Sequence, residues 1–380
     1  MISLIWIAVN VMIAILGYLI TPDSSPNANH QQLEIRTEPP GFTIKTLKVT
    51  KNHSVSSPDV FSKMLFGSPN NFAYYPLHSY AIDSCLITIF SYSGDAEIPG
   101  VERSFYLADV LYSIDPAQDI FCRNDSLFFT KYDGNFTGES VVKLAEKVID
   151  NQIVNQNFLL GTDQFGRDML SQLLIGTRVS LSVGFIAVLI SLLVGVTLGS
   201  IAGFFRGKAD DFIVWLINVI WSVPTLIMVI AITFAIGKGY WQVFIAVGLT
   251  MWVDVARVTR GQIISLREKD FVEAARALGI NTYKIITRHI LPNIYGPLIV
   301  ISAANFASAI LIEAGLSFLG MGVQPPTPSW GSMIKENYGY IILDKAYLAI
   351  LPGIAIMLMV LSFLMAGNSL RDALDKTSSE

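Results

Sequence analysis

The chain has 380 residues, of which 52% are hydrophobic and only 15% are charged, and its mean hydropathy is +0.52. An ordinary soluble domain carries about 25% charged residues, so the composition predicts a membrane protein. The net charge of −4 points to no nucleic-acid partner, and the four histidines and two cysteines show no metal-ligand spacing. The sequence also lacks the GxxxxGK[ST] pattern that cradles nucleotide phosphates.

Six apolar stretches are candidates for crossing the ~30 Å hydrocarbon core as helices. They are residues 2–20, 179–205, 212–236, 241–256, 294–319 and 346–367, the fourth being the shortest. The first stretch has no basic residue before it and no small-residue cleavage site before Thr21. We therefore expect it to remain as an anchor, and a cleaved signal peptide is the alternative.

Residues 21–157 separate the first two stretches and carry turn signals and alternating patterns. The candidate strands are rich in β-branched and aromatic residues and run over 42–50, 85–90 and 126–132. A helix is predicted over 142–156. A segment of this length is too long for a structureless connector, so we expect a small, mostly β external domain. The spacing of Cys85 and Cys122 allows either a disulfide or two free thiols.

Residues 158–178 bring charges next to the second apolar stretch, in the sequence LLGTDQFGRDML. We expect an interfacial helix whose first free N–H groups are capped by Thr162 or Asp163. Arg167 can form a local ion pair, because Asp163 and Asp168 lie close to it in sequence.

Residues 273–293, EAARALGINTYKIITRHILPN, form a polar elbow between the fourth and fifth apolar stretches. A helix is predicted over 267–278. Its apolar face would comprise Phe271, Ala274, Ala275 and Leu278, which follow helical spacing. Gly279 suits the left-handed residue that ends a helix.

A second short helix is predicted after Gly279, with Asn281 or Thr282 as its cap. Its apolar stripe would comprise Ile280, Tyr283, Ile286 and Ile290. Pro292 would end it. The elbow then has three possible roles: docking into a groove of a cytoplasmic partner, lying on the lipid surface, or acting only as a polar turn. Ala274 and Ala275 favour docking, because small side chains allow close backbone approach.

Lys and Arg residues of short loops predict the orientation. With the N-terminus inside, the inner segments hold Arg206, Lys208, Arg257, Arg260, Arg267, Lys269, Arg276, Lys284, Arg288, Arg371 and Lys376. The outer short loops hold only Lys238, Lys335 and Lys345. Both ends of the chain are therefore expected in the cytoplasm. The proline-rich segment 323–331 then lies outside, either as a contact for another protein or gate, or as a rigid loop before a short surface helix.

Several motifs of the sequence resemble a known family. Glu273-Ala274-Ala275, Gly279 and Ile290-Leu291-Pro292 reproduce the EAA pattern of permease subunits in ABC importers. The segments 161–181, 313–334 and 368–375 resemble the C-type permeases of the dipeptide, oligopeptide and nickel importers. The resemblance covers about 158–375 and the first span. The family's usual external segment is much shorter than 21–157.

The resemblance implies an all-α polytopic membrane protein with six transmembrane helices and the permease fold of type I ABC importers. The external domain would be inserted after the first helix. The expected organisation is a transmembrane anchor (1–20), a periplasmic domain (21–157), an interfacial segment (158–178), a permease core (179–370) with a cytoplasmic coupling loop (257–293), and a cytoplasmic tail (371–380). The protein would lie in the bacterial inner membrane.

The resemblance further implies a transport subunit rather than an enzyme. It would work with a second permease subunit, two ATPase subunits and an external substrate-binding protein, and it would bind no cofactor itself because ATP and Mg²⁺ belong to the ATPase. Peptides are the expected solute, with nickel or another small solute as the alternative. A secondary transporter or a channel is the rival from another class, and dependence on a separate ATPase distinguishes it.

The candidate site residues fall into two groups. Those expected to couple the chain to the ATPase are Glu273, Ala274, Ala275, Gly279, Ile280, Tyr283, Ile286, Ile290, Leu291 and Pro292. The candidates for the solute pathway are Glu313 and Asp254, carboxylates within predicted spans, and Pro224, which should kink the third span. The alternative for the two carboxylates is snorkelling to the membrane interface, or local pairing such as Asp254 with Arg257.

Overall fold

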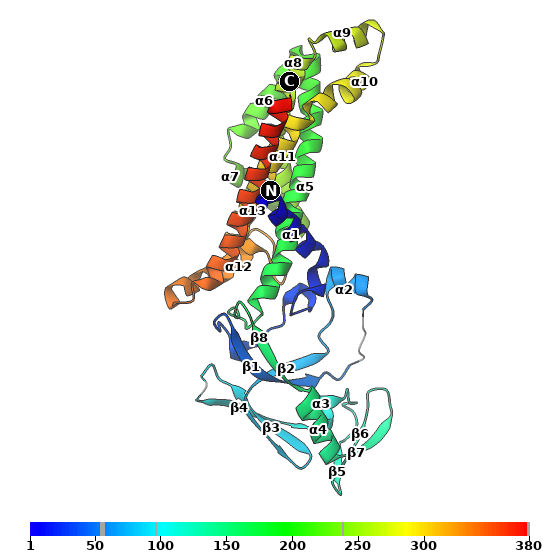
Figure 1. The fold of residues 1–380 in the computed structure, drawn as a ribbon, viewed down its shortest axis with the longest axis vertical. Coiled ribbons are helices and arrows are strands. Elements are labelled where there is room, and N and C mark those ends of the chain that lie inside the picture. Colours follow the sequence, from blue (N-terminus) through cyan, green and yellow to red (C-terminus); the bar gives the residue numbers. More distant parts are fainter. Residues whose placement is uncertain (54–57, 96, 238, 378–380) are drawn as a thin grey trace. The chain divides into compact units, whose positions relative to one another are not determined.

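A computed structural model describes residues 1–53, 58–95, 97–237 and 239–377. Lys238 of the predicted outer loops and the last three residues of the predicted tail lie outside them. The chain forms two compact units. The helical unit comprises Met1–Ala14, Gly176–Tyr338 and Ala349–Glu380, and the sheet unit comprises Ile15–Ile175 and Gly339–Leu348. Figure 1 shows the elements of each.

The sheet unit is built on a five-stranded antiparallel sheet in the order β4-β3-β2-β1-β8. The strands are β1 (Phe42–Thr50), β2 (Phe72–Asp83), β3 (Leu86–Tyr92), β4 (Pro99–Tyr106) and β8 (Ile153–Phe158). The predicted strand 42–50 is confirmed as β1. The predicted helix 142–156 is too long, because Ile153 and Val154 leave it and pair with β1 as part of β8. β-Branched residues favour that extended state.

The sheet unit also contains a second antiparallel sheet of three strands, together with short α-helices. The second sheet comprises β5 (Phe121–Arg123), β6 (Ser126–Thr130) and β7 (Phe136–Ser140). The helices of the unit are α2 (Val60–Phe66), α3 (Leu107–Leu111) and α4 (Val141–Asn151). One core joins β1, β3, α3, β6 and α4 through Leu47, Ile87, Leu107, Phe129 and Leu144, which are all fully buried.

A disulfide joins Cys85, next to β3, to Cys122 of β5, and so links the two sheets. This resolves the alternatives left by the sequence in favour of a bridge. It closes a loop of sequence separation 37. Loops of that size contribute about 3–4 kcal/mol through the entropy of the unfolded chain.

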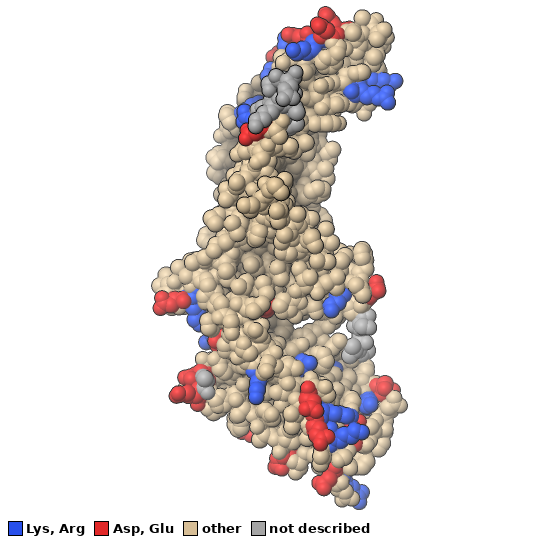
Figure 2. All heavy atoms as spheres, in the orientation of Figure 1, with Lys and Arg blue, Asp and Glu red and all other residues tan. Residues whose placement is uncertain are grey.

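The helical unit contains the long apolar helices. With α1 (Ile2–Leu16), its elements are α5 (Met169–Phe205), α6 (Gly207–Trp221), α7 (Thr225–Ile236), α8 (Tyr240–Leu266), α9 (Asp270–Ala277), α10 (Thr282–Lys284), α11 (Tyr295–Phe318), α12 (Trp330–Asn337) and α13 (Tyr347–Thr377). In the described chain, five helices are long and apolar enough to cross a membrane, or six if the bent pair α6–α7 is one span. On the face seen in Figure 2, the middle of this unit carries almost no charged side chain.

Close packing of α5 on α8 depends on glycines spaced four residues apart. A Cβ atom at Gly195 would lie 2.6 Å from the Cβ of Val255, and one at Gly199 would lie 2.6 Å from the carbonyl oxygen of Ala256. Gly203 repeats the pattern against Arg260. Small residues at this spacing let two helix backbones approach closely within a membrane.

The start of α5 differs from the prediction. No separate interfacial helix occurs in 158–178, because α5 is continuous from Met169. The cap is Asp168 rather than Thr162 or Asp163: its Oδ2 accepts the N–H of Ser171, 2.9 Å away. Asp163 instead pairs with Arg167 at 2.6 Å, with side chains only 2% and 5% exposed, which confirms the expected local pairing.

The segment after α11 leads into the short helix α12. Ser329 and Ser332 form a capping box at its start, and Trp330 is 1% exposed. The predicted short helix therefore exists, but its first residues are buried rather than on the surface. Trp330 packs against Gly176 of α5, where a Cβ would lie 3.0 Å from the indole ring.

Candidate functional site

The elbow between α8 and α11 begins with α9, a helix of eight residues. Its end is a Schellman motif. The N–H of Gly279 donates to the carbonyl of Arg276 at 2.9 Å, and the N–H of Ile280 donates to the carbonyl of Ala275 at 3.1 Å. Gly279 has a φ of +70°, and a Cβ there would meet no atom within 4 Å. The glycine is therefore required by backbone conformation and not by crowding.

The second part of the elbow starts at Asn281, whose Oδ1 accepts the N–H of Tyr283 at 2.9 Å. The predicted stop at Pro292 is wrong: the chain continues through a π-helical segment, Ile285–Ile290, and a 3₁₀ turn, Leu291–Ile294, directly into α11. Proline cannot donate the next helical hydrogen bond, and the change of helix type absorbs that loss.

Burial divides the elbow residues into a supporting and a presented set. The supporting side chains are buried and include Val272, Ala275, Ile285 and Ile290, which pack in one cluster with Phe204 and Val255. Ile280, Ile286 and Leu291 are partly buried against the same cluster. The predicted apolar face of the first helix is therefore displaced by one residue, because Val272 rather than Phe271 turns inward.

The presented set remains exposed. Glu273, Ala274 and Pro292 are exposed, and large apolar side chains stand out beside them. Leu278 is 79% exposed, Tyr283 is 74% exposed and Phe271 is 40% exposed. Figure 2 shows charged side chains over α9 and α10. Exposed apolar side chains with a charged rim are the composition of a protein-binding patch.

The elbow is tied to the long helices by contacts with α5. The Arg267 guanidinium donates to the carbonyl of Phe204 at 2.7 Å, and the Arg276 guanidinium lies 4.9 Å from the centre of the Phe204 ring. Arg260 of α8 forms a two-pronged ion pair with Asp210 of α6, with a shortest distance of 2.5 Å. Displacement of the elbow would therefore be passed to α5, α6 and α8.

The pathway candidates lie in different surroundings. Asp254 lines a cavity of about 370 Å³ among α7, α8 and α11, with Thr225 and Asn305 also in the lining. Arg257 lies over the Trp221 ring, 4.0 Å from its centre. Pro224 lies in the break between α6 and α7, where the two helices bend by 95°. The predicted kink of the third span is therefore present and is sharper than a simple proline kink.

Glu313 is fully buried in α11 and is not part of the lining of that cavity. The Ser317 hydroxyl donates to its Oε1 at 2.6 Å, and Ser329 joins the same chain of hydroxyls. The Glu313 side chain therefore lies inside the described chain and not on its surface. The cavity also contains residues that sequence reasoning missed. Asn305 is 4% exposed, and its Nδ2 donates to the carbonyl of Met251 at 3.4 Å. A lone amide inside an apolar stretch is the signal that could have found it.

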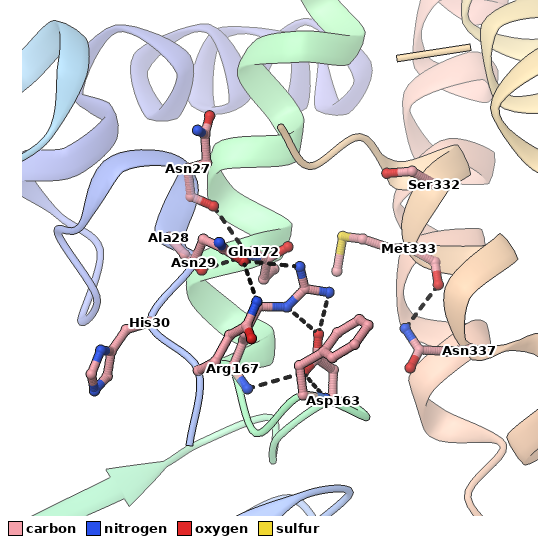
Figure 3. Close-up of polar contacts among 12 residues, drawn as sticks. Asn27, Ala28, Asn29, His30, Asp163, Arg167, Gln172, Ser332, Met333 and Asn337 are labelled. Atoms are coloured by element: carbon pink, nitrogen blue, oxygen red, sulfur yellow. Dashed lines mark hydrogen bonds and ion pairs between the residues drawn. The ribbon is translucent and has the colours of Figure 1, made fainter. Parts of the chain in front are cut away.

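A second polar cluster lies in the sheet unit and is shown in Figure 3. Arg167 pairs with Asp163 and also reaches Asn29, with Nη1 3.3 Å from Oδ1. The Gln172 amide donates to the backbone carbonyls of Asn27 and Ala28. These contacts fix residues 27–29 against the start of α5.

Comparisons with known proteins identify the family. The family described as the binding-protein-dependent transport system inner membrane component matches residues 195–379. A glutathione transport system permease protein of Pectobacterium atrosepticum is 39% identical over 216 residues, covering 57% of this chain and 71% of that protein. A di/tripeptide transport system permease protein of Pseudomonas aeruginosa is 42% identical over 219 residues, covering 57% and 72%.

An oligopeptide transport system permease protein of Bacillus subtilis is 36% identical over 215 residues, covering 57% of this chain and 70% of that protein. The chain is therefore a membrane permease subunit and belongs to the family of binding-protein-dependent transport system inner membrane components. The resemblance inferred from the EAA pattern and its companion motifs is confirmed. The chain is accordingly a transport component, and in this family ATP is hydrolysed by a partner.

Proposed function

We propose that this chain forms half of the membrane pathway of an ATP-driven importer for di- and oligopeptides. The second half would be another permease subunit, and two ATPase subunits with Mg²⁺ and ATP would dock from the cytoplasm. An external binding protein would deliver the solute. The named relatives that transport dipeptides, tripeptides, oligopeptides and glutathione support a peptide solute. Nickel or another small solute remains the alternative for the same architecture.

The elbow is the observation that carries this proposal. Leu278 and Tyr283 are exposed to 79% and 74%, although other apolar side chains of the elbow are buried in one cluster with the long helices. A groove on the ATPase would cover these two side chains. Glu273 would contact a donor at the rim of that groove, and Ile280 and Ile286 would support the bound conformation from behind. Gly279 would set the angle between α9 and α10.

The proposed mechanism is a two-state pathway. ATP binding would close the ATPase dimer and draw the two elbows together, and the contacts of Arg267 and Arg276 with Phe204 would pass the motion to α5. Binding of ATP shifts the balance only because the two states differ in their affinity for the closed ATPase. The cavity with Asp254 and the break at Pro224 would line the pathway. Glu313, buried outside that cavity, would act indirectly by holding α11 to Ser329.

The proposed topology has six spans, with α6 and α7 as one broken span and both termini in the cytoplasm. Residues 1–20 would anchor the chain, 21–157 would form the periplasmic domain, 158–178 would lead into the core of 179–370, and 371–380 would be the tail. The Cys85–Cys122 disulfide supports a periplasmic position, because such bridges persist in oxidising compartments.

The test is a pull-down of the tagged chain from its own membranes in mild detergent, with partners identified by mass spectrometry. The wild type should recover an ATPase and a second permease. The double substitution Leu278→Ser and Tyr283→Ser should lose the ATPase but keep the second permease. Phe205→Ser removes another exposed apolar side chain at the end of α5 and should keep both. Recovery of a transport-active chain without any ATPase would instead show a secondary transporter or channel.

A further inference from the structure

A small polar cavity in the sheet unit has no role in the proposed transport mechanism. It has a volume of about 190 Å³ and lies among the segment 22–32, strands β2 and β8, and the residue that caps α5. Its polar lining includes Asp23, His30, Gln32, Gln156 and Asp168. The cavity therefore differs from an ordinary packing defect, which would be lined by apolar side chains.

Two buried polar atoms in this lining have no hydrogen-bond partner among the residues that the structure describes. Gln32 is 4% exposed, and its Oε1 is unpartnered. The Nε2 atom of His30 is also unpartnered. Leaving a buried polar group without a partner is unfavourable, and a ligand that formed the missing hydrogen bonds would offset that cost.

The hydrogen bonds of Asn70 determine which ring nitrogen of His30 carries the proton. The Oδ1 of Asn70 accepts the N–H of Phe72 at 3.2 Å, so its N–H₂ group is the one that faces the histidine. That group lies 3.0 Å from Nδ1 of His30. Nδ1 is therefore the acceptor, and the neutral ring carries its proton on Nε2, as a donor into the cavity. Burial lowers the pKa of His30 and favours this neutral form. Its ring points away from the Arg167 cluster in Figure 3.

The remaining groups of the lining divide into acceptors and a donor. The carboxylate of Asp23 accepts hydrogen bonds from the backbone N–H groups of Ser25 and His30, and its remaining lone pairs can accept further ones. Burial raises the pKa of Asp168, and the nearby charge of Asp23 raises it further. Gln156 uses its Oε1 to accept from Thr46 at 3.0 Å, so the polar group it adds to the lining is its N–H₂.

This arrangement suits a ligand that carries both a positively charged donor group and a hydrogen-bond acceptor. Asp23, Asp168 and Gln32 provide the three acceptors that a primary ammonium group requires, and His30 and Gln156 provide donors for a neighbouring carbonyl oxygen. No group of three His, Cys, Asp or Glu side chains in the described chain is arranged to hold a metal ion. The volume corresponds to about six waters at ~30 Å³ each, which is enough for a ligand with a similar number of heavy atoms.

We propose that this cavity is a binding site for a small primary ammonium compound that carries a carbonyl oxygen next to its amine, of the size of an amino acid amide. Gln32 and Asp23 hold the ammonium group, and His30 and Gln156 hold the oxygen. The site is formed wholly by the sheet unit, so it stands independently of the solute that the transporter carries.

The test is a titration of the 380-residue chain in detergent micelles with a small-molecule probe at pH 7. Ligand-observed saturation-transfer NMR measures the binding. Glycinamide is the probe, and glycolamide, in which a hydroxyl replaces the ammonium group, is its neutral isostere. Glycinamide should bind saturably, and glycolamide at least tenfold more weakly. Asp23→Asn and Gln32→Leu should each weaken glycinamide binding at least tenfold. Gln31→Leu, at the adjacent exposed position, should leave it unchanged.

Thermal unfolding without ligand separates binding from a structural role. Gln32→Leu removes an unpartnered buried acceptor, so its unfolding temperature should equal or exceed that of the wild type while binding is lost. A Gln32 that only supports the fold would lower the unfolding temperature when replaced. Equal binding of glycolamide, binding that survives Gln32→Leu, or the absence of saturation would each overturn the proposal.

Discussion

At the residue scale, Gly279 shows how a single backbone conformation shapes the candidate coupling surface. Its φ of +70° lets two hydrogen bonds end α9 and turn the chain so that Leu278 and Tyr283 face outward. The glycine could be predicted from the sequence, because a helical pattern followed by glycine is typical of this motif. The inward turn of Val272 in place of Phe271 could not, because both residues are apolar and the partner surface of α5 and α8 selects between them.

The first prediction concerns this glycine. Gly279→Val places a β-branched residue in the left-handed region, which costs about 1–2 kcal/mol or more locally. The permease should still insert, but ATP hydrolysis should no longer drive uptake in proteoliposomes that contain the whole complex. Glu273→Lys should act in the same direction through the rim contact.

Gly207→Val is the matched control. Gly207 also has a positive φ, +58°, and a Cβ there would also meet nothing within 4 Å. Valine at position 207 would cause the same kind of backbone strain, but this position lies outside the elbow. Gly207→Val should therefore retain coupled uptake. Coupled transport by Gly279→Val and Glu273→Lys at the wild-type level would refute the assignment of the elbow.

The second prediction uses the titration of His30. Burial lowers its pKa in the folded chain, while Asp23 opposes and Lys51 assists the shift. The unfolded chain therefore binds the proton more readily, so the contribution of His30 to stability is complete above the unfolded pKa of about 6.5 and is lost as the pH falls through the lower folded pKa. Asp168 acts in the opposite sense, because its raised pKa favours protonation of the folded chain.

The measurement is the unfolding temperature of the sheet unit within the full chain between about pH 8 and pH 5. The wild type should lose more stability on acidification than His30→Gln, which lacks the His30 contribution. Gln31→Leu, which removes no ionisable group, should retain the wild-type slope of unfolding temperature against pH. Equal slopes of unfolding temperature against pH for the wild type and His30→Gln would contradict the prediction.

At the scale of elements, the α5–α8 contact depends on the absence of side chains. Gly195, Gly199 and Gly203 follow one another at four-residue spacing, which is one face of a helix. The spacing is visible in the sequence, but the facing helix is not. The fold also decides where α5 begins, since Asp168 and not Asp163 caps it.

The third prediction compares two glycine substitutions within these helices. Gly199→Ala would bring a Cβ within 2.6 Å of the backbone oxygen of Ala256, and backbone cannot move aside cheaply. It should destabilise the helical unit by roughly 1–3 kcal/mol. Gly261→Ala on α8 meets nothing within 4 Å and should be neutral or stabilising by up to about 1 kcal/mol. Denaturant or heat titration of both variants in micelles gives the comparison, and equal stabilities would argue against close packing at Gly199.

At the scale of the whole molecule, the proposed function requires a connection between the elbow and the cavity that Asp254 lines. α8 carries both the residues next to the elbow and Asp254 itself, and it contacts α6 and α11. It also contacts α5 at Gly195 and Gly199. A rigid helix of this length can transmit displacement from one site to the other. In the proposed mechanism, the packed helices and the Arg260–Asp210 ion pair would carry this coupling.

The fourth prediction tests the pathway at this scale. Asp254→Asn removes a carboxylate from the cavity lining, and a charge-assisted hydrogen bond contributes about 1.5–3 kcal/mol. Peptide uptake by the complete transporter should fall by roughly tenfold or more, while the ATPase remains bound. Asp211→Asn removes the same charge at an exposed position of α6 and should leave uptake unchanged. Equal uptake by the two variants would place Asp254 outside the pathway.

The amino-acid sequence by itself determined the class of the protein, its long apolar helices, the positions of the EAA elbow and the presence of a separate β-rich domain. These depend on composition, periodicity and local backbone preference, which are properties of short segments. Asn281 as a cap and Gly279 as a left-handed residue were predictable for the same reason.

Only the tertiary structure decided which side chains are presented and which are buried. It joined Cys85 to Cys122 and buried Glu313 away from the cavity. It also placed residues 153–156, which were predicted to be helical, in a strand, and it continued the chain past Pro292 into α11. It also brought Asp23, Gln32 and Asp168 to one cavity. The physical reason is common to all of these cases: each depends on contacts between segments far apart in the chain, and local sequence preference carries no information about them.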